Sequence, residues 1–438
     1  MEAAKEQKTN LLSSTSEVTA AVAAPAGAEE AARRGGCGTS RTRRVVRCAL
    51  SCALLYPVVV YAGLGVLLAL PSAQALLVCL HTAKYVLRAD YTSPAKVFVL
   101  GARDVRLRVP ARPTAGGGAP LEAVELGMWH VLPAGAPGAL AAGANAAAGG
   151  ERARTAVAKF DAALRAPDGG VVVLFLHGNG EHRAAQQGPI HARAISAALR
   201  SHVLMLDYRG FGDSSGWPSE EGLAADAHAA WLWLTAERGV APSRVLLWGH
   251  SLGSAVAARL AAELADAARA STLARGRAAG APAALPLGLV LESAFTSIRE
   301  LLPDYPLGRA VCWLPGVRAA AAAGLAFRMD SRARVAELAR AAPQLPLLLL
   351  HGTVDATVPA AHSRALLDAA RAAGAQRASL VELPSADHHT VLASDEALLA
   401  VARLIGRASG GEGAQLSAGA EPAHALPARA ARRAGGRN

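Results

Sequence analysis

The sequence predicts an α/β fold: a doubly wound, mostly parallel sheet with a cap insertion and one N-terminal transmembrane helix. From residue 171 onward, short apolar runs alternate with longer segments in which Ala and Leu recur at helical spacing. The runs are almost entirely apolar, as expected of parallel strands that helices cover on both faces. One run leads through Gly-x-Ser-x-Gly into an Ala-rich helical segment, which is the order strand, sharp turn, helix.

Composition limits the function classes. The chain has 438 residues, of which 52% are hydrophobic, so one large domain with terminal appendages is possible. A net charge of +11 could indicate nucleic-acid binding, but no basic stripe is interleaved with aromatic residues. Of the five cysteines only Cys312 lies in the main body, and no cysteine–histidine spacing is typical of a metal site. We therefore expect no nucleic-acid partner.

The N-terminal region predicts membrane attachment. Residues 1–44 have no apolar period and are expected to form a disordered basic segment. Residues 45–71 are expected to form a signal anchor, because the uncharged stretch that begins at Cys48 is long enough to span a bilayer. Pro57 is tolerated in a bilayer helix. The long leader argues against a cleaved signal peptide, and a buried helix of a soluble domain is the remaining alternative.

The charges around this segment predict its orientation. Arginines cluster on its N-terminal side, so the positive-inside rule places residue 1 in the cytosol. The main body then faces the lumen of the secretory pathway or the cell exterior. The segment 72–87 could lie along the membrane surface or pack on the main domain.

The main domain is expected to cover residues 72–407. Residues 296–340 contain several prolines and apolar clusters and are expected to form a cap or lid. Two tracts, 110–120 and 134–150, are expected to be surface insertions, and residues 408–438 a disordered tail. The expected strands are 104–109, 121–133, 171–176, 203–206, 245–248, 287–291, 345–350 and 379–383.

The turn after 245–248 carries the candidate nucleophile, Ser251. The glycines Gly249 and Gly253 permit a strained turn and a close approach of helix and strand, which would expose the serine hydroxyl. The pattern alone is weak, because glycine is frequent in this chain. The alternative is an ordinary glycine-rich turn of a parallel-sheet protein, so the assignment depends on partners for Ser251.

A serine hydroxyl needs a base to remove its proton and an acid to orient that base. Asp355 follows the strand 345–350, and the pair His388 and His389 follows the strand 379–383. We expect Asp355 as the acid and His388 as the base, with His389 as the alternative base. Asp355 could instead cap a helix. Asp207 and Asp213 are rival acids, but they precede the serine and flank a turn.

The oxyanion of an acyl-transfer intermediate requires two backbone N–H donors. We expect them from Leu252, which follows the nucleophile, and from Asn179 in the loop after the strand 171–176. His177, Glu181 and His182 of the same loop could suggest a metal site. Adjacent positions of a tight loop point in different directions, so we expect no metal there.

Several segments resemble the α/β-hydrolase family. They resemble most the branch of α/β-hydrolase-domain-containing proteins that includes membrane-anchored lipases of lysophosphatidylserine and monoacylglycerol. The likeness extends from the N-terminal anchor to about residue 405. It is carried by HGNGEHR at 177–183, DYRGFGDS at 207–214, GHSLG at 249–253, ESAFTSIRE at 292–300, HGTVDATVP at 351–359 and DHH at 387–389. The inserts 110–120 and 134–150 and the C-terminal tail have no counterpart in it.

The resemblance implies a serine hydrolase with Ser251 as nucleophile, Asp355 as acid and His388 as base. It implies a lipid ester as substrate, no metal or organic cofactor, and a single-pass protein of the endoplasmic reticulum or plasma membrane. Its catalytic domain would be lumenal or extracellular. Two other functions fit the same residues: a protein thioesterase or peptidase with this triad, and a membrane-tethered binding protein without catalysis.

Overall fold

The computed structural model describes residues 36–70, 72, 74, 75, 79, 89–113, 120–136, 151–166, 168–184, 187–274 and 285–409. The expected N-terminal disorder up to residue 35, most of the insert 134–150 and the tail from 410 lie outside these residues. The strands are β1 (Ala102–Val109), β2 (Val124–Val131), β3 (Val172–Leu176), β4 (His202–Leu206), β5 (Val245–His250), β6 (Gly288–Glu292), β7 (Leu347–Gly352) and β8 (Ala378–Leu383). The helices are α1 (Gly36–Ala69), α5 (Glu151–Arg165), α6 (Gly188–Leu199), α7 (Glu220–Leu232), α8 (Leu252–Ala274), α9 (Ile298–Leu301), α10 (Pro306–Val311), α11 (Val317–Gly324), α12 (Ser331–Ala341), α13 (Ala361–Ala372) and α14 (Asp395–Ala408).

The eight strands form one sheet in the order β1-β2-β4-β3-β5-β6-β7-β8. The first two are antiparallel to their neighbours, and β2 joins the sheet through β4. All pairings from β4 to β8 are parallel, and β5 lies between β3 and β6. The predicted strands and the mostly parallel sheet are therefore confirmed. β5, which leads to the candidate nucleophile, occupies the middle of the sheet.

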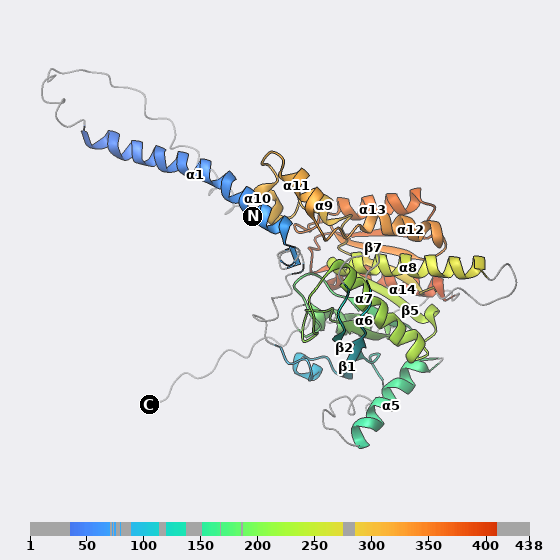
Figure 1. Ribbon diagram of the computed structural model, residues 1–438. Coiled ribbons are helices and arrows are strands. Elements are labelled where there is room, and N and C mark those ends of the chain that lie inside the picture. Colours follow the sequence, from blue (N-terminus) through green and yellow to red (C-terminus); the bar gives the residue numbers. More distant parts are fainter. Residues whose placement is uncertain are drawn as a thin grey trace, which may run out of the picture. The chain divides into compact units, whose positions relative to one another are not determined.

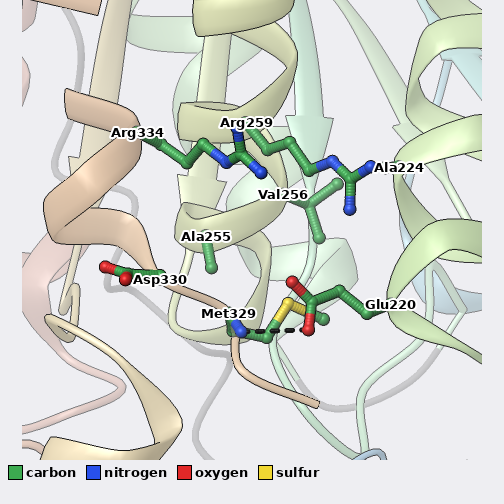
Figure 2. Close-up of a pocket in the computed structure, with 8 residues that line it drawn as sticks. All are labelled: Glu220, Ala224, Ala255, Val256, Arg259, Met329, Asp330 and Arg334. Atoms are coloured by element: carbon green, nitrogen blue, oxygen red, sulfur yellow. Dashed lines mark hydrogen bonds between the residues drawn. The ribbon is translucent and has the colours of Figure 1, made fainter. Parts of the chain in front are cut away.

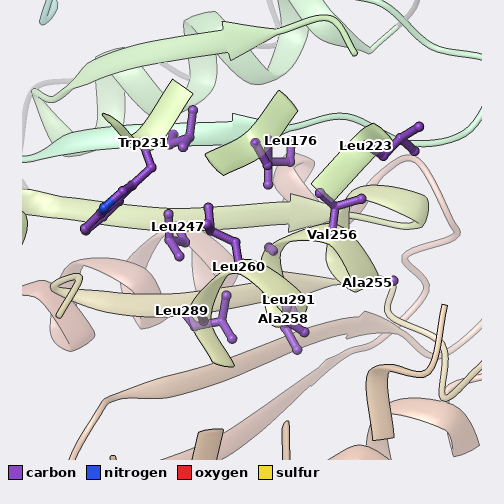
Figure 3. Close-up of a cluster of buried hydrophobic side chains, with 14 of the residues drawn as sticks. Leu176, Leu223, Trp231, Leu247, Ala255, Val256, Ala258, Leu260, Leu289 and Leu291 are labelled. Carbon is purple, nitrogen blue, oxygen red and sulfur yellow. The ribbon is translucent and has the colours of Figure 1, made fainter. Parts of the chain in front are cut away.

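Alternate residues of the parallel strands enter two separate cores, one on each face of the sheet. On one face Leu247 of β5 packs with side chains of α7, α8, α12 and α13. On the other, Trp248 packs with side chains of α6 and α14. Figure 3 shows the first core, where Leu289 and Leu291 of β6 lie beside α8. Helices on both faces explain why these strands are apolar throughout, and they fix β5 from both sides.

The expected cap, 296–340, contains three short helices followed by a longer one. The short helices are α9, α10 and α11; α12 instead packs against α8 and α13 as part of the layer that covers the sheet. Between α11 and α12 the backbone N–H groups of Arg328 and Met329 donate to Glu220 at the start of α7, at 2.6 and 3.1 Å. Figure 2 shows the bond from Met329 to Glu220. These two residues line a cavity of about 10 Å³. The excursion therefore ends near Met329, earlier than expected.

Helix α1 begins at Gly36, before the expected start of the anchor at residue 45, and continues through Pro57. Several large apolar side chains on it are exposed, among them Val45, Leu55 and Val59. In the part of the chain that the structure describes, no helix is both long and apolar enough to cross a membrane. Contacts divide the chain into two units, and the division falls within α1, after Tyr61.

Two segments outside the predicted strands belong to the main domain. Gln74 is buried, donates to the carbonyl oxygen of Gly324 at 2.9 Å and accepts from the N–H of Ala326 at 2.6 Å. This favours packing on the main domain for the described residues of 72–87. Helix α5 follows the insert 134–150; the sequence analysis did not predict it. It buries Phe160 and pairs with Arg103 through Asp161.

Candidate active site

The turn between β5 and α8 places Ser251 in a strained backbone conformation. Its φ angle is +50°, in the left-handed region that L-residues rarely adopt. A Cβ atom on Gly249 would lie 2.2 Å from the carbonyl oxygen of Gly253, and one on Gly253 would lie 2.0 Å from that of Leu176. Only glycine fits at these two positions, because α8 passes in direct contact with β5 and β3. The Ser251 N–H donates to the carbonyl of Glu292, at the end of β6, at 2.9 Å.

The structure brings Ser251, His388 and Asp355 together from three different strand ends. His388 Nε2 lies 3.0 Å from Ser251 Oγ, and His388 Nδ1 lies 2.7 Å from Asp355 Oδ2. The other carboxylate oxygen of Asp355 accepts from the N–H groups of Thr357 and Val358, at 2.9 and 2.8 Å. These bonds hold the carboxylate in the loop before α13, so Asp355 is not the cap of that helix.

The environment favours the protonation states that base catalysis requires. Burial lowers the pKa of His388, and its hydrogen bond to Asp355 offsets part of this effect, so the ring is neutral near pH 7. Burial would raise the pKa of Asp355, but hydrogen bonds from His351 and His388 outweigh burial and lower it. An ionised Asp355 only accepts hydrogen bonds. The proton of His388 therefore resides on Nδ1, and Nε2 is left to accept from the serine hydroxyl.

The remaining candidates for base and acid lie elsewhere. The side chain of His389 is 51% exposed, and its Nδ1 lies 3.7 Å from Glu181 rather than beside Ser251. Asp207 and Asp213 both pair with Arg183. His389, Asp207 and Asp213 therefore do not contact Ser251 or His388 as base or acid of the triad.

The two expected oxyanion donors lie in suitable backbone positions. Leu252 is the first residue of α8, where N–H groups have no acceptor within the helix. Asn179 follows β3, and its N–H has no protein acceptor within the described part of the chain. Neither N–H group has a protein acceptor in the described residues, and their role as oxyanion donors stays a prediction.

His250 also contacts the base, and the sequence analysis did not single it out. Its Nε2 lies 3.0 Å from the backbone oxygen of His388. On its other side, Nδ1 lies 3.4 Å from Glu181, which accepts from the N–H of Gly178 at 2.9 Å. Burial alone would lower the pKa of His250, but the charge of Glu181 raises it to about 9. The sequence could have indicated a role for His250 through its position directly before Ser251.

A second buried charge of the same loop, Arg183, has a different environment. Its guanidinium contacts Asp207 and lies 2.7 Å from Asp213 and 2.9 Å from Asp104. The guanidinium carbon, Cζ, lies 4.8 Å from the centre of the Tyr91 ring. Burial would lower its pKa, but the three aspartates outweigh burial and raise it. These contacts anchor the loop that carries Asn179 to β1 and to the turn after β4.

Comparison with known proteins assigns the family. The model of the α/β-hydrolase fold family matches residues 171–305. Human protein ABHD12B is 33% identical over 288 residues, which are 64% of this chain and 68% of that protein. The chain belongs to the ABHD12-like α/β-hydrolases.

Other relatives of this ABHD12-like chain extend the match. The lysophosphatidylserine lipase ABHD12 of Danio rerio is 29% identical over 352 residues, which are 77% of this chain and 75% of that protein. Among solved structures, an esterase of Pyrococcus furiosus aligns over 72% of this chain and 92% of its own, with 16% identity and a TM-score of 0.46. As an ABHD12-like α/β-hydrolase, the chain is a carboxylic ester hydrolase.

Proposed function

We propose that this ABHD12-like hydrolase is a membrane-anchored serine lipase that cleaves acyl esters of lysophospholipids or monoacylglycerols. The hydrogen-bonded series from Ser251 through His388 to Asp355, at 3.0 and 2.7 Å, carries the proposal. Related proteins named lysophosphatidylserine lipase support the substrate class. A neutral base within hydrogen-bonding distance of a strained serine is the arrangement that nucleophilic acyl transfer requires.

In the first half of the reaction, Ser251 Oγ attacks the acyl carbonyl carbon while His388 Nε2 takes the hydroxyl proton. The resulting imidazolium is stabilised by Asp355, whose carboxylate is held by backbone N–H groups. The carbonyl oxygen becomes an oxyanion and accepts from the N–H groups of Leu252 and Asn179. His388 then gives its proton to the leaving glycerol oxygen, and the acyl group remains on Ser251.

In the second half, His388 removes a proton from water, and the resulting hydroxide attacks the acyl-enzyme. The same two N–H groups hold the second oxyanion. Its collapse releases the fatty acid, and the proton returns from His388 to Ser251 Oγ. Every proton moves between residues of the chain, the substrate and water, so the proposed reaction uses no metal or organic cofactor.

Membrane attachment through α1 is part of the proposal. The helix has 34 residues, no acidic residue in its first turn and no charge between residues 48 and 69. Its exposed apolar side chains, such as Val58 and Val66, are costly in water and stable in a bilayer. The arginines on the N-terminal side of its uncharged stretch favour a cytosolic N-terminus and a lumenal or extracellular catalytic domain, in the endoplasmic reticulum or plasma membrane. Such an anchor keeps the active site close to an insoluble substrate.

Covalent labelling tests the nucleophile. A fluorophosphonate probe should label the full-length protein, and Ser251→Ala should abolish labelling and ester hydrolysis. Ser243→Ala, at an exposed position outside the site, is the matched control and should label like the parent. Equal labelling of Ser251→Ala and the parent would reject the triad. No labelling of the folded parent would instead favour a non-catalytic binding protein.

A substrate panel tests the reaction class. Lysophosphatidylserine and monoacylglycerol should both be assayed beside acyl-cysteine peptides and peptide esters. Hydrolysis of either lipid supports the proposal, and the ratio of the two rates gives the head-group preference. Activity on acyl-cysteine or peptide esters alone would replace the lipase with a thioesterase or peptidase.

Protease protection tests the orientation. In sealed microsomes a tag fused after residue 438 should resist added protease and become sensitive once detergent opens the membrane. Digestion without detergent would place the catalytic domain on the cytosolic side. Extraction of the protein by alkaline carbonate would contradict the anchor itself.

A further inference from the structure

A cluster of three side chains beside the triad has no role in the proposed acyl transfer. Glu181 comes from the loop after β3, His250 ends β5, and His389 follows β8. One ligand atom of each residue lies within 4.8 Å of the ligand atoms of the other two. The three positions are far apart in the sequence, and the sheet brings them together at the carboxyl ends of its parallel strands.

The individual distances are close to those between ligands of a single ion. His250 Nδ1 lies 3.4 Å from Glu181 Oε2, and His389 Nδ1 lies 3.7 Å from Glu181 Oε1. The rings of His250 and His389 have their centres 5.9 Å apart. A tetrahedral Zn²⁺ with bonds of about 2.0–2.1 Å separates neighbouring ligand atoms by about 3.4 Å. The two distances end on different oxygens of Glu181, and with one ligand atom taken from each residue all three atoms lie within 4.8 Å of one another. An ion would therefore draw the three side chains closer together.

Two of the groups are buried, and one polar atom of each has no hydrogen-bond partner. His250 is fully buried and Glu181 is 3% exposed. Within the described residues, neither His250 Nδ1 nor Glu181 Oε1 has a hydrogen-bond partner. His250 cannot turn the nitrogen away, because Nε2 is held by the backbone oxygen of His388. Buried polar atoms without hydrogen-bond partners are rare in folded proteins, and a bound ion is one arrangement that satisfies them.

We propose that Glu181, His250 and His389 bind one Zn²⁺ or a similar divalent transition-metal ion. The set of one carboxylate and two imidazoles is typical of zinc sites that leave a fourth position to water. His389 is half exposed, so an ion can reach the cluster from solvent on its side. The Gly178 N–H, which donates to Glu181, and the backbone oxygen that holds His250 fix the two buried ligands in place.

Metal titration of the full-length protein tests the site. After treatment with a chelator, the protein should bind one equivalent of Zn²⁺ by calorimetry. It should also bind one equivalent of Co²⁺, with the strong visible absorption of a four-coordinate ion. Glu181→Gln and His389→Asn should each weaken binding at least about tenfold. His389→Asn alters an exposed side chain, so it tests the site even if Glu181→Gln fails to fold. These readouts do not depend on ester hydrolysis, so the proposed lipase activity and the proposed site can fail separately.

His228→Asn is the matched control, because His228 lies on α7 outside the cluster and should leave metal binding unchanged. Unchanged affinity in His389→Asn would overturn the proposed ligand set. Absence of saturable binding by the parent would overturn the site and leave the cluster as an ion pair between protonated His250 and Glu181.

Discussion

Arg183 and Glu181 belong to one loop and are both buried, but their surroundings differ. Arg183 has three aspartates around its guanidinium, from β1 and from the turn after β4. Glu181 faces two histidines, and one of its oxygens has no hydrogen-bond partner within the described residues. The positive charge of Arg183 is compensated by three carboxylates that contact its guanidinium directly. The negative charge of Glu181 is compensated only when a neighbouring histidine is protonated or another cation binds there.

This difference separates a structural ion cluster from a candidate binding site. Removing Arg183 leaves Asp207 buried without the guanidinium, whereas removing the charge of Glu181 removes the largest attraction that keeps a proton on His250. In the loop that carries Asn179, we therefore expect the fold to depend on the charge of Arg183 more strongly than on the charge of Glu181. The following experiments test this contrast.

The largest effect is expected for Arg183→Met. It leaves Asp207 buried without its partner and removes the contacts to Asp104 and Asp213. Loss of one member of a buried ion cluster costs about 3–5 kcal/mol of unfolding free energy. Urea denaturation followed by circular dichroism measures this loss.

Arg183→Lys is the control for geometry. It keeps the charge, but a single ammonium cannot reproduce the forked contacts of a guanidinium. We expect an intermediate loss of stability. Full recovery by lysine would show that charge alone matters, and a loss below about 1 kcal/mol for Arg183→Met would remove the contrast between the two clusters.

A smaller effect is expected for Glu181→Gln. Glutamine still accepts from the Gly178 N–H through its side-chain oxygen, and the main charge that keeps His250 protonated is gone. The loss of unfolding free energy should stay at about 1–2 kcal/mol in the same denaturation assay, with a chelator present. A loss as large as that of Arg183→Met would mean that Glu181 is also an irreplaceable structural charge.

The smallest effect concerns the pH dependence of hydrolysis. The base must be neutral, and the pKa of His388 is lowered from 6.5, so kcat/KM should fall with decreasing pH only below pH 6.5. Burial is the main cause, and the charge of His250 contributes. Glu181→Gln removes the main charge that keeps His250 protonated, while Glu292 remains, and it should move this decline upward by less than about one pH unit. Profiles with a soluble ester and a chelator measure the shift.

Arg183→Met is the reference for that measurement, because Arg183 does not contact the base. If it remains folded, its profile should match that of the parent. An identical decline in Glu181→Gln and the parent would show that His250 does not influence His388.

The parallel strands could be predicted because burial on both faces makes each of them a short apolar run. The same reasoning placed Asp355 and His388 in loops after strands, where parallel strands bring polar residues to one edge. Helix α5 was missed because most of its residues are charged or alanine, and it follows a Gly/Ala tract that reads as an insertion. Phe160 and Asp161 contact residues that are distant in the sequence, and a local sequence pattern does not predict such contacts.

The sequence could not separate His388 from His389, since adjacent residues share every sequence argument. The turn after β8 separates them. Asp387 accepts from the N–H groups of His389 and Thr390, at 2.9 and 3.0 Å, and this turn directs His388 inward and His389 outward. The grouping of His389 with Glu181 likewise depends on the order of strands in the sheet. The sequence argument against a metal considered only neighbours within one loop, and could not include ligands from β5 and from the loop after β8.

The strand that delivers the base is the last in the sheet order, paired with β7, and most of its residues are partly exposed. Ser251, in contrast, follows the central strand β5. Edge strands fray at a lower free-energy cost than central ones. On heating, therefore, the base should detach while the serine and most of the fold remain in place. On heating, ester hydrolysis should therefore decline at a lower temperature than the helical circular-dichroism signal. This first loss of activity should be reversed on cooling.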